Sequence, residues 1–185
     1  MKGITLSILA LFLAIGLSAQ THVGIKGGLN YTDLKLKEVK FKNNTGWHAG
    51  LLLQSKLPLG FAFQPEVLYS VKSFKLMSDN NISFNYIEVP VNIQWGIDLI
   101  LLRPFVMAAP YFSYLLKVGD SKSEWDGAKS VDYGFGLGGG LDIWKLQVTC
   151  KYNWGFGNLG SVKSSDWKVK DSNLQGFQLS VGLLF

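Results

Sequence analysis

The stretch from Val131 to Ile143, VDYGFGLGGGLDI, alternates large apolar residues with glycine and aspartate at a period of two. Successive side chains of a strand point to opposite faces, so this pattern predicts a strand with bulk on one face and little on the other. The small face carries Asp132, Asp142 and four glycines between them. We expect such a strand in the wall of a narrow closed barrel whose outside meets lipid and whose inside is crowded and polar.

Seven further segments show similar alternation, and they lie at residues 23–30, 46–57, 61–74, 82–97, 103–118, 145–154 and 174–185. The connections alternate between long polar stretches, such as 31–45, and short ones, such as 57–60. Bacterial membrane barrels have long extracellular loops and short periplasmic turns. The sequence therefore predicts an all-β chain, an eight-stranded antiparallel up-and-down transmembrane β-barrel of porin-like type.

Two local features refine this prediction. Pro65, Pro90 and Pro110 fall inside predicted strands, where proline removes a donor from the ladder, so we expect a bulge or weakened pairing at each. The glycines of 131–143 are expected to face the interior and to make room for Glu66, Glu88 and Arg103.

The first 20 residues are typical of a secretory signal peptide. Lys2 supplies a positive charge, and residues 4–17 form an apolar run too short for a convincing membrane-spanning helix. Small residues follow at 18–20, and cleavage after Ala19 and cleavage after Gln20 fit equally well. We therefore expect a signal peptide at 1–20 and one barrel domain at 21–185. The single cysteine, Cys150, allows no intrachain disulfide.

Alternation alone does not say which face looks outward. A soluble barrel of the lipocalin type would turn its large apolar residues inward. The charged content of 17% is below the average of about 25% for soluble domains. Aromatic residues gather near predicted strand ends, and the last strand ends at Phe185. These features favour the membrane alternative, in the outer membrane of a Gram-negative bacterium and in contact with its lipids.

The polar face of a membrane barrel points inward, and buried charges need partners. The expected interior ion-pair network consists of Lys26, Glu66, Glu88, Arg103 and Lys151. Glu66 and Glu88 lie on adjacent predicted strands, with Arg103 and either lysine as candidate cations. We interpret this network as a structural plug, with a proton or solute path as the alternative. Side chains fill an eight-stranded barrel, so an open channel is not expected.

The sequence offers little for catalysis or cofactor binding. No Ser-His-Asp set is identifiable from spacing, and no cluster of metal ligands or cofactor motif stands out. The glycine run at 138–140 is not followed by a helix, so it is not a phosphate loop. We predict a protein that is not an enzyme. A lipid-modifying enzyme with His48 as its base remains the alternative.

The long loops are the expected functional surface. Lysines recur at positions 35, 37, 40 and 42, and again at 163, 168 and 170. They can approach lipopolysaccharide or a protein partner, or they can simply keep the loops soluble. The net charge of +5 is modest, and export argues against a nucleic-acid partner. The predicted function is structural or partner-binding through these loops, with a small-solute or lipid-binding barrel as the alternative.

Three segments carry a resemblance to a known family: GIKGGLN at 24–30, FQPEVLYS at 63–70 and YIEVPVN at 86–92. They resemble the PorT-like outer-membrane β-barrel family of Bacteroidetes-type bacteria, and Arg103-Pro104-Phe105 has a counterpart there. The resemblance implies an eight-stranded outer-membrane barrel and an interior structural role for Glu66 and Glu88. It implies no single activity. The namesake assists a secretion system, and no residue of this chain distinguishes that role.

Overall fold

The computed structural model describes residues 20–34, 44–75, 81–119, 131–156, 162–164, 167–169 and 174–185. The expected signal peptide lies outside the described residues, apart from Gln20. The lysines at 35, 37, 40, 42 and 170 also lie outside them. Among the described residues, no helix has the length and apolar character needed to cross a membrane.

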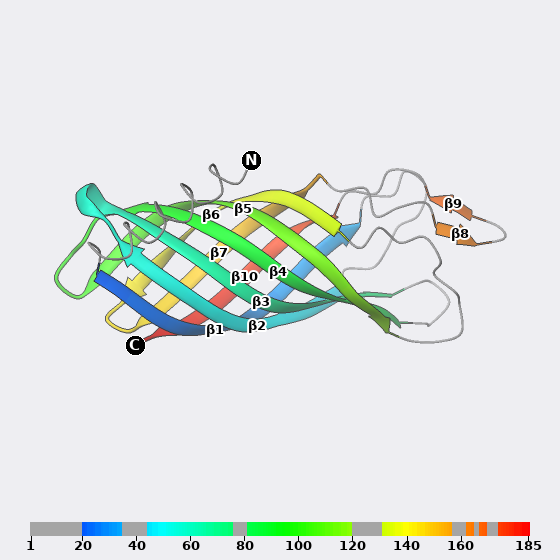
Figure 1. Cartoon of the computed structure of the whole chain (residues 1–185), viewed down its shortest axis with the longest axis horizontal. Helices are drawn as coiled ribbons and strands as arrows, with labels where there is room; N and C mark the ends of the chain where they lie inside the picture. The colour runs from blue at the N-terminus through cyan, green and yellow to red at the C-terminus, as the bar shows by residue number, and fades with distance from the viewer. Residues whose placement is uncertain are drawn as a thin grey trace, which may run out of the picture.

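Eight antiparallel strands form a closed barrel in the order β1-β10-β7-β6-β5-β4-β3-β2 (Figure 1). Their bounds are β1 Gln20–Leu34, β2 Asn44–Lys56, β3 Phe61–Lys75, β4 Asn81–Gly96, β5 Leu102–Gly119, β6 Val131–Ile143, β7 Leu146–Gly155 and β10 Leu174–Leu184. β1 pairs with β10 from Gly24–Leu184 to Leu34–Leu174, which closes the barrel and leaves no free edge. The predicted fold class is confirmed.

The short connections gather at one end of the barrel, which we call the turn end, and the long ones leave from the other, the loop end (Figure 1). The β2–β3 connection contains a single 3-10 turn, η1 Pro58–Gly60. Two short strands that the sequence did not predict, β8 Val162–Ser164 and β9 Trp167–Val169, pair beyond the loop end (Figure 1).

The large apolar residues face outward. On β6, Tyr133 and Leu137 are about half exposed, whereas Asp132 is buried. The same alternation holds on β3, where Val67 is exposed between the buried Glu66 and Leu68. A soluble barrel would bury this apolar surface, because exposing it to water is costly. The outward face therefore fits lipid, and the lipocalin-type alternative is wrong.

The glycines of β6 do face inward, but they make room for different side chains than predicted. A Cβ atom on Gly140 would lie 2.6 Å from Cζ of Phe105, and one on Gly138 would lie 2.7 Å from Cβ of Lys151. A Cβ atom on Gly134 would collide with the ring of Tyr111. The glycines thus admit the neighbours on β5 and β7, because close packing occurs between adjacent strands rather than across the lumen.

The prolines weaken strand pairing as expected, but they do not form bulges. The ladder is interrupted between Leu52–Glu66 and Ser55–Phe63 beside Pro65, and between Pro90–Tyr111 and Ile93–Ala108 beside Pro110. β3 and β4 keep one register across Pro90, but the ladder is interrupted there, between Pro65–Val91 and Leu68–Glu88. β5 pairs with β6 without a shift at Pro110. The register shift lies instead between Asn85 and Tyr86, where β5 has one additional residue.

Candidate functional site: the barrel interior

The lumen holds charged side chains of both signs in equal number among the described residues. Four are basic and four are acidic, and all are buried: Lys26, Lys72, Arg103 and Lys151, and Glu66, Glu88, Asp132 and Asp142. Unpaired buried charge is expensive, so this balance is what a closed interior requires. All five residues of the predicted network are among them, and the structure adds Lys72, Asp132 and Asp142.

Arg103 does not pair with Glu66 or Glu88. Its Nη1 donates to Asp142 Oδ2 at 3.2 Å and to Gln94 Oε1 at 3.0 Å, and its Nε lies 3.5 Å from Asp98 Oδ1. Its Nη2 donates to the backbone oxygen of Gly60 at 2.9 Å. Register explains the difference, since Arg103 and Asp142 are directly opposite each other on β5 and β6. Arg103 therefore ties the β2–β3 and β4–β5 turns to the end of β6.

Four glutamines form a layer across the lumen beside Arg103. Gln64 on β3 and Gln147 on β7 exchange two hydrogen bonds of 2.9 and 3.0 Å across the barrel. Gln94 donates to Gln64 at 2.9 Å, and Gln54 donates to Gln94 at 3.3 Å. All four side chains have no solvent exposure. The sequence places them on the inward face, but their common level depends on strand stagger, which alternation does not reveal.

The middle of the lumen holds the ion pairs. Lys26 Nζ lies 2.7 Å from Glu66 Oε1, which also accepts a 2.7 Å hydrogen bond from Gln64. Glu88 lies 3.6 Å from Nζ of Lys72, a residue outside the predicted network. Lys151 is 2% exposed, and its Nζ has no hydrogen-bond partner. Its charge interacts with Glu66 and Glu88 through the lumen.

His48 takes part in a chain of three side chains from β1, β2 and β10. Its Nε2 is 2.9 Å from Ser180 Oγ, and its Nδ1 is 3.0 Å from Asn30 Oδ1. The amide of Asn30 donates to Ser70 Oγ, so Asn30 Oδ1 is the acceptor. His48 therefore carries its proton on Nδ1 and accepts from the Ser180 hydroxyl. The sequence did not predict this set, because Ser180 and His48 become neighbours only when the barrel closes and both lie beside Gly28.

The order of these contacts matches that of nucleophile, base and orienting group in serine hydrolases. Packing around the hydroxyl does not match. Ser180 is 2% exposed, and a Cβ atom on Gly28 would lie 2.7 Å from both Ser180 Cα and His48 Cε1. An active site needs space about 3 Å from the nucleophile for the reacting carbonyl. The contacts shown here hold three strands together.

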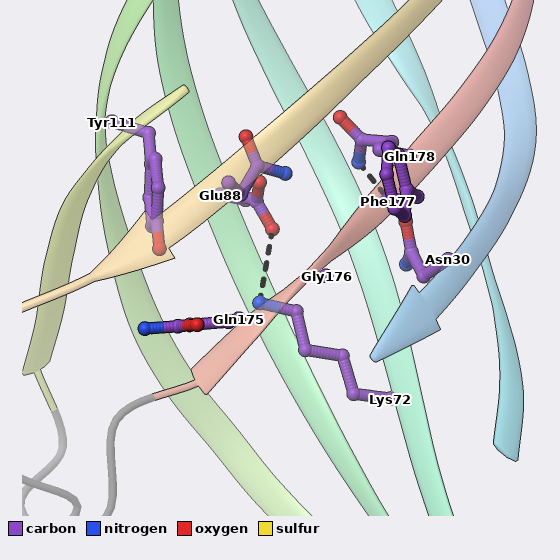
Figure 2. Close-up of a pocket in the computed structure, with 9 residues that line it drawn as sticks. Asn30, Lys72, Glu88, Tyr111, Gln175, Gly176, Phe177 and Gln178 are labelled. Carbon is purple, nitrogen blue, oxygen red and sulfur yellow. Dashed lines mark hydrogen bonds and ion pairs between the residues drawn. The ribbon is translucent and has the colours of Figure 1, made fainter. Parts of the chain in front are cut away.

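A small cavity of about 20 Å³ lies at the loop end of the lumen. Figure 2 shows Lys72 and Glu88 pointing toward each other in it, with Asn30 and Gln178 side by side and Tyr111 on another wall. This volume accommodates an ordered water molecule, and the polar lining offers partners for it. Among the described residues, no group of three or more potential ligands is placed to hold a metal ion.

Solved structures of outer-membrane barrels are similar to this fold. Neisserial surface protein A is 11% identical with a TM-score of 0.52, and 88% of this chain covers 97% of that one. The outer membrane enzyme PagL is 8% identical with a TM-score of 0.54, covering 86% and 98%. The outer membrane protein OprG from Pseudomonas aeruginosa is 10% identical with a TM-score of 0.52, covering 90% and 97%. At these identities the likeness shows the fold alone.

A comparison with curated proteins finds no match. The family described as outer membrane protein beta-barrel domain matches residues 18–160, which is most of the barrel. The match agrees with the eight-stranded closed sheet and its apolar exterior, and it places the chain in the outer membrane of Gram-negative bacteria. The chain belongs to the outer membrane protein beta-barrel domain family.

Proposed function

We propose that the protein is a non-enzymatic integral outer-membrane barrel that acts as a structural or partner-binding scaffold through its long extracellular loops. The observation that carries this proposal is the filled lumen. The glutamine layer and Arg103 link the walls through buried side chains. A barrel filled in this way provides rigidity rather than a path, so the long loops are the surface left for recognition.

Lipopolysaccharide is the partner favoured by the loop chemistry. Lysines at 35, 37, 40 and 42 stand in one expected extracellular loop, and phosphate groups attract such clusters electrostatically. Replacing these four lysines by glutamine should weaken binding of the purified barrel to lipopolysaccharide by about tenfold at low salt. Heat-modifiable gel migration would show that the variant still folds.

The matched control is replacement of Lys56 and Lys145, which lie at the turn end. Glutamine at these two positions should leave binding to lipopolysaccharide unchanged. An equal loss of lipopolysaccharide binding in the loop variant and in the control variant would contradict recognition through the loops. Unchanged binding in both would remove lipopolysaccharide as the partner and leave a protein partner as the alternative to be tested by loop replacement.

The catalytic alternative has one specific observation behind it, the hydrogen-bonded set of Ser180, His48 and Asn30. We propose a structural role for it, because its hydroxyl is enclosed. PagL has a similar fold and is called an enzyme, but 8% identity carries no activity to this chain. A serine-directed fluorophosphonate probe should leave the folded protein unlabelled. Labelling that disappears in Ser180→Ala would establish the catalytic alternative.

Two finer points accompany the proposal. Residues 1–20 are proposed to be the signal peptide, with cleavage after Ala19 or after Gln20. Cleavage after Ala19 retains Gln20, which pairs with Lys56 at the start of β1. Mass spectrometry of the mature protein tests this.

Membership of the PorT-like group rests on the segments at 24–30, 63–70 and 86–92. The resemblance to that group implies an interior structural role for Glu66, and the ion pair between Glu66 and Lys26 supports this role.

A further inference from the structure

The connections at the turn end of the barrel expose large apolar residues, whereas turns ordinarily have polar or small ones. Leu59 is 87% exposed, Leu101 73%, Trp144 82%, and Ile100 is fully exposed. These four residues form what we call the apolar turn rim. They come from the three connections β2–β3, β4–β5 and β6–β7. Single exposed apolar residues need no explanation, but one on every turn of the same end does.

Turn geometry does not account for these residues. The backbone amide of Leu99 donates to Leu102 O at 2.9 Å, so Ile100 and Leu101 are the tip of a two-residue turn. Glycine, asparagine and aspartate are favoured at such positions. Leu59 has a φ of 63° and Trp144 a φ of 53°, a left-handed conformation that large side chains rarely adopt. Strain retained at an exposed position points to a role for the side chain.

The apolar turn rim continues the lipid-facing surface of the barrel. On the β4–β5 hairpin the outward row runs from Ile87 through Trp95 to Leu99 without a polar interruption. With a rise of about 3.3 Å per residue and a tilt of about 40°, this row spans about 30 Å along the barrel axis. The apolar band of such barrels is about 25 Å tall. The row therefore reaches past the hydrocarbon boundary by a few ångströms.

Charge and rigidity at this end also fit a lipid surface. The ammonium of Lys145 lies 5.5 Å above the ring of Trp144, and Lys56 lies 3.8 Å from Asp98 beside the β4–β5 turn. Tryptophan with nearby cations is typical of the membrane interface. The turns are held together, since Trp144 N donates to Leu101 O and Arg103 binds Gly60 O. The rim is thus presented as one preformed surface.

We propose that the apolar turn rim inserts into the boundary between headgroups and acyl chains of the periplasmic leaflet. The turn end of the barrel is then anchored in lipid and does not project into the periplasm. This inference does not depend on what the extracellular loops bind.

Site-directed fluorescence tests the proposal on the full mature barrel. In a Cys150→Ser background, Ile100→Cys and Lys145→Cys are each labelled with bimane and reconstituted in phosphatidylethanolamine–phosphatidylglycerol vesicles. We expect iodide to quench the Ile100 label about threefold less than the Lys145 label, and lipids brominated near the headgroup to quench it more. A separate sample of the native chain, labelled at its own Cys150 on the exposed outer wall, gives the reference for full lipid contact.

Two outcomes overturn the proposal. Iodide quenching of the Ile100 label as strong as that of the Lys145 label would place the turn in water. Protection of the Ile100 label from both iodide and brominated lipid would mean that protein, such as a second copy of the chain, covers the rim.

A second variant separates lipid contact from folding. Ile100→Ser with Leu101→Ser introduces residues that suit a turn, so folding in detergent should be unchanged. The folded fraction in vesicles should fall about two- to tenfold, because the apolar contact with lipid is lost. Equal folded fractions of the variant and the native chain in vesicles would contradict the proposal.

Discussion

The two halves of the lumen hold their polar side chains in different ways. At the turn end, Arg103 and the glutamine layer form short, direct hydrogen bonds between most of the strands. Toward the loop end, Asn30 is hydrogen-bonded to His48 and Gln178, each at 3.0 Å. The charged groups there are held less closely, since Lys72 and Glu88 are 3.6 Å apart, Lys151 has no hydrogen-bond partner, and a cavity of about 20 Å³ remains. The difference indicates a sealed, rigid half and a looser half in which water can complete the contacts.

Arg103→Met should have the largest effect on this comparison. It removes the guanidinium from Asp142, Gln94 and Gly60. The buried carboxylate of Asp142 is then left without a cation and is held only by hydrogen bonds from Gln54 and Gln147. We expect a loss of about 3–5 kcal/mol in the free energy of unfolding. Urea titration in lipid vesicles, followed by heat-modifiable gel migration, measures it. Arg103→Lys keeps the charge without the planar fork and should lose less. A loss below about 1 kcal/mol for Arg103→Met would show that the turn end is not held by this residue.

Glu66→Gln tests the tight ion pair next to the glutamine layer. The change leaves Lys26 without its carboxylate, so we expect a loss of about 3 kcal/mol in the free energy of unfolding. Combining it with Lys26→Met should recover most of that loss, because the two residues act on each other. The same urea titration serves for both variants. Additive losses in the double variant would argue against a direct pair.

Ser180→Ala tests whether the contacts of His48 are structural. Loss of the hydrogen bond to Nε2 should reduce the free energy of unfolding by about 1–2 kcal/mol, with no change in outer-membrane lipid composition. Ser113→Ala is the matched control, because the Ser113 hydroxyl is buried without a hydrogen-bond partner. That control should be nearly neutral. A change of lipid chemistry in Ser180→Ala alone would favour catalysis.

Lys72→Met should have the smallest effect, and it probes the loose half. The Lys151 ammonium, which has no hydrogen-bond partner, also interacts with Glu88 through the lumen. It can compensate for the lost cation, so we expect a loss below about 1 kcal/mol in the free energy of unfolding. The double variant with Lys151→Met should lose more than the sum of the single losses. A Lys72→Met loss equal to that of Glu66→Gln would mean that both halves are held equally tightly.

Alternation was enough to predict the fold because it reports local geometry. The limits of β6 agree with the prediction at both ends, and β3 differs by one residue. The face of each interior residue was also predictable, as for Glu66, Glu88 and Lys151. The partners were not, because they depend on register and closure. Asp142 meets Arg103 through β5–β6 pairing, and Ser180 meets His48 across the seam between β1 and β10.

Ionic conductance of the mature barrel in planar bilayers tests the sealed turn end most directly. The hydrogen-bonded layer of Gln54, Gln64, Gln94 and Gln147 predicts no current steps above the lipid baseline. The measurement is made in about 1 M potassium chloride, where charges are screened. Gln64→Ala with Gln147→Ala removes the contact across the lumen and should give measurable leak. Stable current steps from the unchanged chain would contradict a sealed lumen, and with it the scaffold function proposed for this protein.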